Sequence, residues 1–310
     1  MQKIGDKVSF KNDNIIITDA DGKTKCQCSC YKLFMVFIVG GFTVTTGIIE
    51  RSKRFGFSIA LLTTTFRVYE TINFKMEGNT LLRIKQYTNQ NGNEIGRKII
   101  INKIENQGHI LNVLRDANAK VDVVELQKYI DKLETVNGNS YEIMGIEGIA
   151  SKVYFNRIFK EFDWKGRQPR VKRDRINLLL DIGYTVLFNY LEAILNIYGF
   201  DIYKGNLHKE FYKRKSLVCD IIEPFRPLID YQVRKVHTLK QVDKWTFSND
   251  NGRYQMDFKN STEFVAIILK IILEYKESMF EYIQQYYRWF MKDKELEYFP
   301  KARLMKNDTN

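Results

Sequence analysis

The segment from Gly205 to Pro227, GNLHKEFYKRKSLVCDIIEPFRP, combines the residue types from which a metal site is built. His208 follows a Gly-Asn-Leu turn, and Asp220 and Glu223 stand on either side of two isoleucines. Positions three apart on a helix share one face, so the two carboxylates are predicted to point into the same space. Carboxylates half-buried among apolar residues need a neutralising partner. A divalent cation with imidazole and carboxylate ligands would provide one.

Glu147 is the predicted third ligand. It lies between two glycines in a helix that is expected to begin around Ser140, and its neighbours in the sequence are mostly apolar. A lone carboxylate in such a setting is costly. Taken alone this signal is weak, because a glutamate on a helix usually faces solvent. The signal at Glu147 becomes stronger beside the His208 segment, whose predicted metal site needs a third ligand.

Two basic segments flank the candidate ligands in the sequence. The first surrounds Trp164 and contains Lys165, Arg167, Arg170, Lys172, Arg173 and Arg175; the second contains Lys209, Lys213, Arg214 and Lys215. Closely spaced Arg and Lys side chains on a loop suit phosphate groups, and Arg binds them through its fork geometry. For the first segment taken alone, phosphate binding and a solvated linker are equally good interpretations.

The overall charge favours a polyanionic partner. The 310 residues include 49 Lys and Arg and 37 Asp and Glu, which gives a formal net charge of +12. Nucleic acid is the first candidate for such a balance, and a basic proteome with no partner implied is the alternative. The start, MQKIGDKVSF, lacks the architecture of an export signal. The longest apolar run, Leu33 to Val39, is shorter than the ~20 residues of a membrane helix, so an intracellular protein without a membrane span is expected.

Residues 1–77 are predicted to form a small β-rich domain. Apolar and alternating runs between Asn, Asp and Gly turns indicate strands from Lys7 to about Asn73. KLFMVFIV is typical of a strand buried on both sides. One short helix is expected in TTGIIERSKRFG, with Thr45 or Thr46 as its cap and Gly56 as its end. A scaffold or dimerisation module is the prediction for this domain.

Three cysteines of this domain alternate along one predicted strand. Cys26, Cys28 and Cys30 could suggest a metal site, but no fourth thiol or histidine lies nearby in the sequence. Buried reduced thiols are therefore the better interpretation than zinc.

Residues 78–310 are predicted to form a larger, all-α catalytic domain. Asp174 is expected to cap a long helix that is apolar on nearly all sides and ends at Gly199, and such a helix belongs in a core. KWTFSNDNGRYQMDF has the alternation and the Asn-Gly turn of a hairpin. The predicted fold class is α+β, with a β-sandwich-like domain followed by a helical one.

Four stretches of the second domain together resemble one protein family. They are G-I-E-G around Glu147, the run R-I-N-L-L-L-x-x-G-Y-T-x-L, the Leu-His pair at His208, and S-L-V-x-D-I-I-E-P-F-R-P-L-I-D. The family is that of the CRISPR-associated adaptation integrases, Cas1, which insert new spacers into a CRISPR array. The resemblance is strong over residues 140–235. It extends more loosely over the first domain, because members of this family have a β-rich domain followed by a helical one.

The resemblance implies a site and a reaction. The metal ligands of the family fall on Glu147, His208 and Glu223, and the cofactor would be Mg²⁺ or Mn²⁺. Asp220 would be an additional catalytic acid, which steers the attacking hydroxyl or holds a metal-bound water. The 3′-hydroxyl of an incoming DNA would attack a phosphodiester at the repeat boundary. A proton shuttle is the alternative role for His208.

Partners and DNA contacts are implied in the same way. The family works as homodimers, bridged by the small partner Cas2, on double-stranded DNA of the spacer precursor and the CRISPR repeat in the prokaryotic cytoplasm. Asn177 and Tyr184 fall on polar positions of the central helix, where they would support the site or contact DNA. Arg226 would pack against the acidic cluster. The expected DNA-binding residues of the basic segments are Lys165, Arg167, Arg170, Lys172, Arg173, Lys213 and Arg214.

Two other functions stay open. The same site could belong to a metal-dependent nuclease that acts on branched or damaged DNA. The chain could also be a DNA-binding scaffold without activity, although the intact set of Glu147, His208, Asp220 and Glu223 argues against that function.

Overall fold

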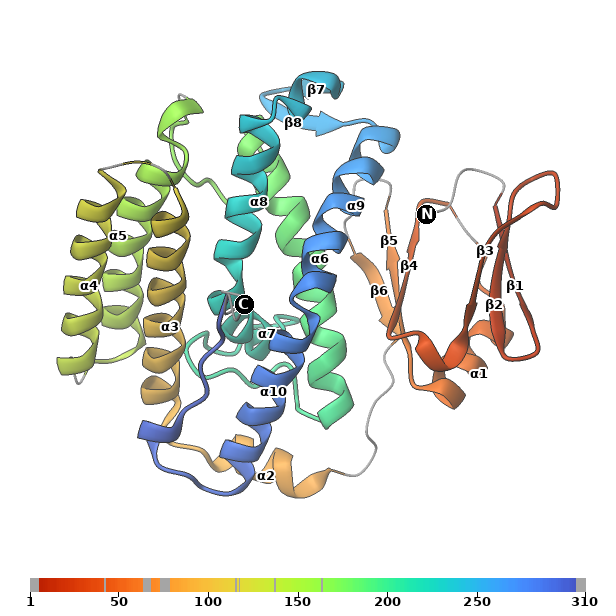
Figure 1. Cartoon of the computed structure of the whole chain (residues 1–310). Coiled ribbons are helices and arrows are strands. Elements are labelled where there is room, and N and C mark those ends of the chain that lie inside the picture. The colour runs from red at the N-terminus through yellow and green to blue at the C-terminus, as the bar shows by residue number, and fades with distance from the viewer. Residues whose placement is uncertain are drawn as a thin grey trace, which may run out of the picture. The chain divides into compact units, whose positions relative to one another are not determined.

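The structure is a computed structural model that describes residues 6–41, 43–63, 68–72, 79–114, 116, 118–136, 138–162 and 164–304 (Figure 1). The chain divides into two compact units, Met1–Met76 and Glu77–Asn310. The domain boundary expected from the sequence, after residue 77, differs from this division by one residue. Each unit is described by itself below.

The first unit contains two three-stranded sheets. The first sheet is an antiparallel meander, and the second joins a parallel pair to an antiparallel one. Their elements are β1 (Lys7–Lys11), β2 (Asn14–Thr18) and β3 (Thr24–Ser29), then β4 (Met35–Val39), β5 (Ser58–Leu62) and β6 (Val68–Ile72). The parallel partners β4 and β5 are connected through α1 (Thr46–Phe55), as a parallel pair requires a crossover. The predicted β-rich class with one short helix is confirmed.

Both sheets and the helix contribute to one apolar core. Ile15 of β2, Ile38 of β4, Ile48 of α1 and Ile59 of β5 are buried in the same cluster. The helix begins after Thr45 and ends at Gly56, whose φ of 74° suits glycine. Both positions were expected from the sequence.

Two expectations for this unit were wrong in part. The strand β4 is not buried on both sides, because it lies at the edge of its sheet, and only Ile38 in it is fully buried. Of the three alternating cysteines, Cys30 is buried, Cys28 is half-buried and Cys26 is exposed. All three are free thiols.

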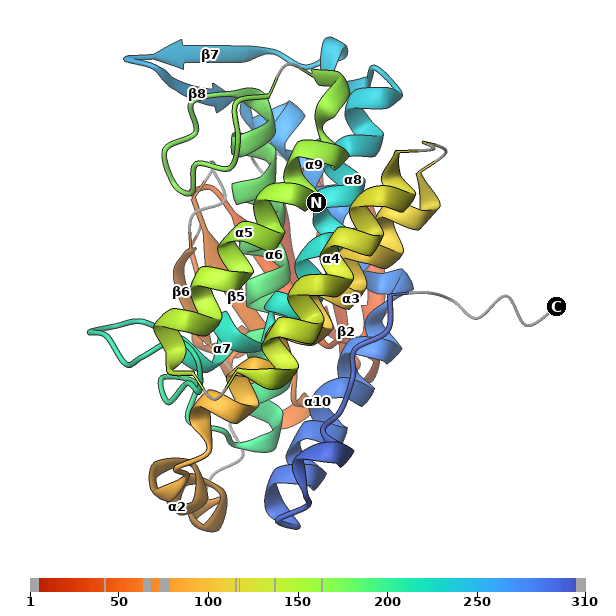
Figure 2. The same ribbon diagram turned by 90° about the vertical axis from the view of Figure 1, so that its left-hand side faces the viewer.

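The second unit is largely helical. Its helices are α2 (Thr80–Thr88), α3 (Gly92–Val113), α4 (Ala119–Thr135), α5 (Ser140–Ile158), α6 (Arg175–Tyr198), α7 (Ser216–Ile221), α8 (Arg226–Thr238), α9 (Phe258–Glu274) and α10 (Lys276–Met291). The expected hairpin is present as β7 (Phe247–Asp250) and β8 (Arg253–Met256). Helices α3, α4 and α5 pack on one another, and Figure 2 shows them side by side as in Figure 1. Helix α3 also contacts α7, α8 and the short 3₁₀ turn Glu223–Phe225, which joins the two groups of helices.

Helix α6 is the core helix of this unit. The Asp174 side chain accepts a hydrogen bond from the Asn177 amide at 2.7 Å, and the helix ends at Gly199 with a φ of 78°. It packs against α7, α8, α9 and α10. By length and mean hydropathy α6 could cross a membrane, although polar residues interrupt its apolar ones. However, 83% of its most apolar stretch is buried inside the protein, as in a core helix.

Candidate active site

The three predicted metal ligands lie in one pocket of the second unit. Glu147 comes from α5, His208 from the loop before α7, and Glu223 from the 3₁₀ turn after α7. The pocket has a volume of about 510 Å³. It is also lined by Lys103, Gln107, Gly148, Ser151, Lys152, Phe155, Asn156, Gly166, Arg167, Pro169, Tyr184, Arg226 and Asp230.

The ammonium group of Lys103 lies between the two glutamates. Its Nζ is 2.5 Å from Glu147 Oε1 and 2.7 Å from Glu223 Oε2. The Lys103 side chain is only 9% exposed. Burial lowers the pKa of this amine, but the two carboxylates outweigh burial and raise its pKa above the usual value. Lys103 is therefore a buried, charged cation at the centre of the acidic pair.

Sequence reasoning did not include Lys103. It lies 44 residues before Glu147 in the chain, and a lysine on a helix normally faces solvent. A weak signal was present, because polar residues are mixed with apolar ones along α3, and four of the polar side chains are buried. The buried polar side chains of this stretch are Asn102, Lys103, Asn106 and Gln107.

Glu223 is held by a second cation as well. Arg226 Nε lies 3.1 Å from Glu223 Oε1, which places the arginine against the acidic cluster as expected. Burial would raise the pKa of Glu223, but Arg226 and Lys103 together lower it to about 2. Glu223 is therefore ionised and ready to bind a cation at neutral pH.

Asp220 and Glu223 do not share a helical face. Helix α7 ends at Ile221 and the chain continues as a 3₁₀ turn around Pro224, so the two carboxylates diverge. Asp220 is fully buried and does not line the pocket. Its oxygens accept hydrogen bonds from the backbone amides of Asn206, Leu207 and His208 at 2.5, 3.2 and 3.0 Å; Oδ1 is also 2.7 Å from His208 Nδ1.

These contacts correct the predicted role of Asp220. Its oxygens are occupied by the His208 loop, so it positions the histidine rather than steering a hydroxyl or holding a water. A carboxylate on Nδ1 orients the imidazole and leaves Nε2 as the nitrogen that can bind a ligand in the pocket. The contact therefore suits a metal-ligating histidine better than a proton shuttle.

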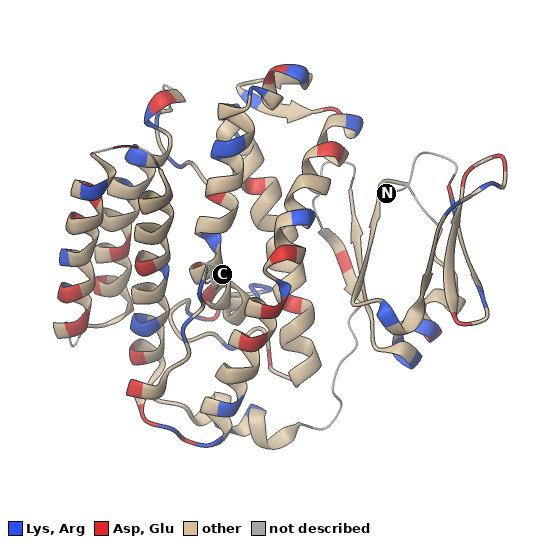
Figure 3. Cartoon of the chain, in the orientation of Figure 1, with Lys and Arg blue, Asp and Glu red and all other residues tan. Residues whose placement is uncertain are grey.

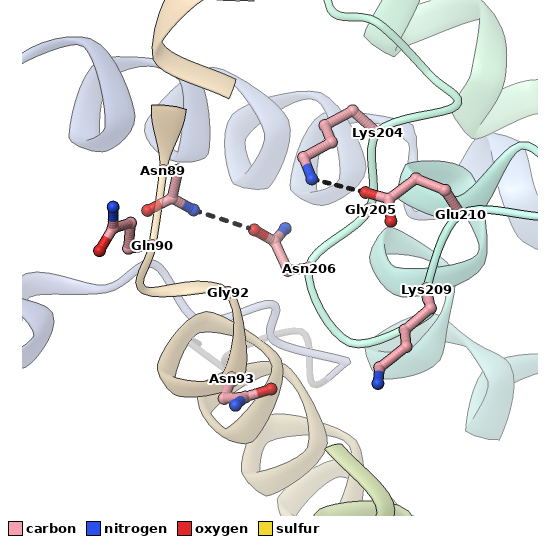
Figure 4. A pocket seen from close by; sticks show the side chains of 9 residues that line it. All are labelled: Asn89, Gln90, Gly92, Asn93, Lys204, Gly205, Asn206, Lys209 and Glu210. Carbon is pink, nitrogen blue, oxygen red and sulfur yellow. Dashed lines mark hydrogen bonds and ion pairs between the residues drawn. The ribbon is translucent and has the colours of Figure 1, made fainter. Parts of the chain in front are cut away.

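Close packing holds the same loop from its other side. A Cβ on Gly205 would lie 2.6 Å from the His208 carbonyl oxygen, and a Cβ on Gly96 of α3 would lie 2.8 Å from Leu207 Cβ. Figure 4 shows Asn206 facing Asn89, and their side-chain amides are joined by a hydrogen bond of 3.5 Å. The His208 loop is thus fixed to α3, the helix that also carries Lys103.

The donor set fits a divalent cation such as Mg²⁺ or Mn²⁺. It offers two carboxylates and one imidazole, and Glu223 Oε2 is a buried acceptor without a well-directed hydrogen bond, although Lys103 Nζ is close to it. Within the described part of the chain, however, no three His, Cys, Asp or Glu side chains are close enough together to hold a metal ion. In this arrangement the Lys103 ammonium group is paired with both glutamates.

Three of the predicted DNA-contacting residues make contacts within the protein. Arg167 forms an ion pair with Asp181 at 2.5 Å and a hydrogen bond with Asn177 at 2.9 Å, and its guanidinium lies over the ring of Tyr184. Asn177 is fully buried and supports the loop before α6, which favours the supporting role over the DNA contact. Tyr184 is buried too and donates its hydroxyl hydrogen bond to Asp230 beside the pocket.

Other basic side chains of the two segments do face solvent. Lys165, Arg170, Arg173, Lys209 and Lys213 are exposed, whereas Lys172 and Arg214 are half-buried. Lys215 forms an ion pair with the buried Glu192 at 2.8 Å. Figure 3 shows a different pattern on α4, where basic and acidic residues alternate. An uncompensated positive charge is therefore concentrated in the segments next to the pocket in sequence.

Comparisons with known proteins agree over most of the chain. The family model described as CRISPR associated protein Cas1 matches residues 1–268. A protein of Thermodesulfovibrio yellowstonii named CRISPR-associated endonuclease Cas1 1 is 27% identical over 252 residues, which cover 76% of this chain and 79% of that protein. A casposase bound to an integration product has a TM-score of 0.78 at 18% identity and covers 98% of this chain and 95% of its own. A chain of a Cas6-RT-Cas1–Cas2 complex has a TM-score of 0.78 at 21% identity and covers 97% of this chain and 35% of its own.

Proposed function

Because the chain belongs to the Cas1 family of CRISPR-associated proteins, we propose that it is a metal-dependent DNA integrase of CRISPR adaptation. In the proposed reaction, the 3′-hydroxyl of a spacer DNA attacks a phosphodiester at the repeat boundary of a CRISPR array. The attacking hydroxyl gives its proton to water as the new P–O bond forms, and the leaving 3′-oxygen takes a proton from water as the old P–O bond breaks. No covalent bond to the enzyme is needed.

The observation that carries this proposal is the convergence of Glu147, His208 and Glu223 in one pocket from three separate elements. A divalent cation bound there would polarise the phosphodiester and stabilise charge on the attacking and leaving oxygens. Asp220 holds the His208 ring in the orientation that this requires. Ser151 holds Glu147 from one turn further along α5, through a hydrogen bond of 2.6 Å.

The exposed basic residues of the two segments would bind the DNA backbone. Side chains such as Lys165, Arg173 and Lys213 have no acidic partner among the described residues, and contacts of this type position DNA without reading its sequence. Steep salt dependence and little sequence preference are the expected result.

Two ends of a spacer must be joined at two places, so one such pocket is not enough. We infer that the chain acts as a homodimer in the prokaryotic cytoplasm, together with the small partner Cas2. The similarity to a chain of a complex that contains Cas1 and Cas2 supports this partner. The first unit would provide the dimer contact.

A hydrolytic nuclease is the second candidate function, because water could replace the 3′-hydroxyl at the same site. The name endonuclease that the relative of Thermodesulfovibrio yellowstonii bears favours it. Joining of strands, against cleavage alone, separates the two functions.

Strand transfer is the experiment that tests the proposal. Purified protein, Mn²⁺ or Mg²⁺, a labelled short duplex with free 3′-hydroxyls and a supercoiled plasmid with repeats should give joined product. Glu147→Gln should abolish joining and leave DNA binding nearly unchanged. Cleavage without joining, even after Cas2 is added, would favour the nuclease. If Glu147→Gln still joined strands, the pocket that contains Glu147 would be excluded as the active site.

A further inference from the structure

Two carboxylates that await a metal ion would repel one another in its absence, and Lys103 relieves that repulsion here. Its Nζ forms short ion pairs with Glu147 Oε1 and Glu223 Oε2, at 2.5 and 2.7 Å. These distances show that the ammonium group occupies the space between the carboxylates. A cation that both glutamates bound would have to take that space.

We propose that Lys103 is a built-in counter-cation, which holds Glu147 and Glu223 together in the metal-free protein and must be displaced when a divalent cation binds. The inference rests on the proposed function, because it takes the two glutamates as metal ligands. Beyond that function, the inference assigns to Lys103 a role in setting the affinity of the site for metal. Lys103 would thereby control how much of the site is occupied by metal without being a metal ligand itself.

The pocket offers the displaced ammonium group a second position. Gln107 lies one turn further along α3 and lines the same pocket. Its Oε1 is buried and accepts no hydrogen bond from any residue that the structure describes. Residues four apart share a helical face, so a change of side-chain rotamer would bring the lysine toward this carbonyl oxygen. The lysine can thus stay charged and partnered after the metal has entered.

The direct test is Mn²⁺ binding by isothermal titration calorimetry on the full chain, at fixed pH and ionic strength. Lys103→Met removes the competing charge and keeps the apolar length of the side chain, so the Kd for Mn²⁺ should fall by about tenfold or more, which is about 1.4 kcal/mol. Lys152→Met is the matched control. Lys152 lines the same pocket but is exposed and contacts neither glutamate, so its removal should change the Kd by less than about threefold.

A Kd in Lys103→Met that equals or exceeds that of the wild type would overturn the inference. Lys103→Gln provides a second neutral side chain if the methionine variant does not fold.

Displacement of Lys103 can also be measured in the wild-type chain, without any substitution. Reductive methylation of Lys103, followed by mass spectrometry of peptides, should be slow in EDTA and faster in saturating Mg²⁺; equal rates would contradict displacement.

Glu147→Gln distinguishes failure of this inference from failure of the proposed function. If the wild type binds Mn²⁺, Glu147→Gln does not, and Lys103→Met equals the wild type, then only the role of Lys103 is wrong. If Glu147→Gln binds as the wild type does, or if no variant binds, the metal site is absent. Both proposals then fail.

Discussion

The two halves of the pocket are held in different ways. The His208 loop is fixed by neutral packing and by hydrogen bonds to the buried carboxylate of Asp220, which does not line the pocket. The two glutamates are fixed by Lys103 and Arg226, and the Lys103 contact is one that another cation can replace. The His208 half of the site is therefore preorganised by the fold, whereas the two glutamates are held in place by ion pairs. The following substitutions separate the two.

Asp220→Ala should cause the largest loss of stability. It leaves three buried backbone amides without an acceptor and the His208 ring without its partner, so the free energy of unfolding should fall by about 3–5 kcal/mol. Urea unfolding of the purified variant measures this. Glu147→Gln is the control from the charged half of the pocket. Its loss of unfolding free energy should be smaller than that of Asp220→Ala by about 2 kcal/mol or more, because Lys103 still forms its ion pair with Glu223. Equal losses would remove the distinction between the halves.

Asp230→Asn should change how stability depends on pH. Burial raises the pKa of Asp230 to about 7, from a usual value of 3.8. Between pH 4 and 7 the unfolded chain has released this proton while the folded one still holds it, so stability falls as pH rises through that window, by up to about 4 kcal/mol. The asparagine variant should match the wild type near pH 4 and exceed it at pH 8.

Glu223 acts in a separate window. Its pKa of about 2 in the folded protein lies below the usual 4.5, so its contribution is present above pH 4.5 and is lost as pH falls toward 2. The difference between the wild type and Asp230→Asn from pH 4 to 8 therefore reports on Asp230, and Glu223 does not contribute to it. If the unfolding free energies of the wild type and Asp230→Asn varied with pH in parallel, Asp230 would not have the raised pKa on which this prediction depends.

Gly205→Ala should disturb the preorganised half through sterics alone. The new methyl group would meet the His208 carbonyl oxygen and Ser216 Cβ at 2.6 and 2.8 Å, so a cost of about 2 kcal/mol is expected, together with weaker metal binding. Gly145→Ala is the control on α5, where a Cβ meets no atom within 4 Å; its stability should stay within about 1 kcal/mol of the wild type. Thermal melts and Mn²⁺ titration measure both. Similar melting temperatures and Mn²⁺ affinities of the two variants would show that close packing at Gly205 does not hold the His208 loop.

The basic segments should give the smallest effect per substitution. Replacing Lys165, Arg173 and Lys213 by glutamine should lower the slope of log affinity against log salt for DNA by about 2–3, which corresponds to ~0.9 for each lost phosphate contact. Replacing Lys120, Lys128 and Lys132 of the mixed-charge helix α4 changes the net charge equally and should leave the slope unchanged. An equal change in both triple variants would show that only net charge matters.

Local signals in the sequence were reliable for this chain. The cap at Asp174, the glycine ends at Gly56 and Gly199, and the hairpin with its Asn-Gly turn depend on neighbouring residues, and the structure has them all. Thr45 holds the N-cap position of α1, but its side chain makes no capping hydrogen bond. The motifs around Glu147 and His208 supported the Cas1 family, which the family model confirms.

Contacts between distant residues could not be read in the same way. Lys103 is 44 residues from Glu147, and the helical periodicity of α3 does not say which buried polar side chain meets a carboxylate. The surroundings of Asp220 could not be predicted because its hydrogen-bond donors come from the loop before α7, whose path the sequence does not show. The choice between the two roles of Asn177 also needed the structure, in which the Arg167 loop folds back onto it.

The most direct test of the central claim is a crystal structure of the wild-type chain soaked in Mn²⁺, with the metal located by its anomalous scattering. The account predicts one strong peak bonded to Glu147, His208 Nε2 and Glu223, at about 2.0–2.2 Å from each, with Lys103 moved away from both carboxylates. A saturated crystal with Lys103 still between the glutamates, and the metal elsewhere or absent, would contradict it.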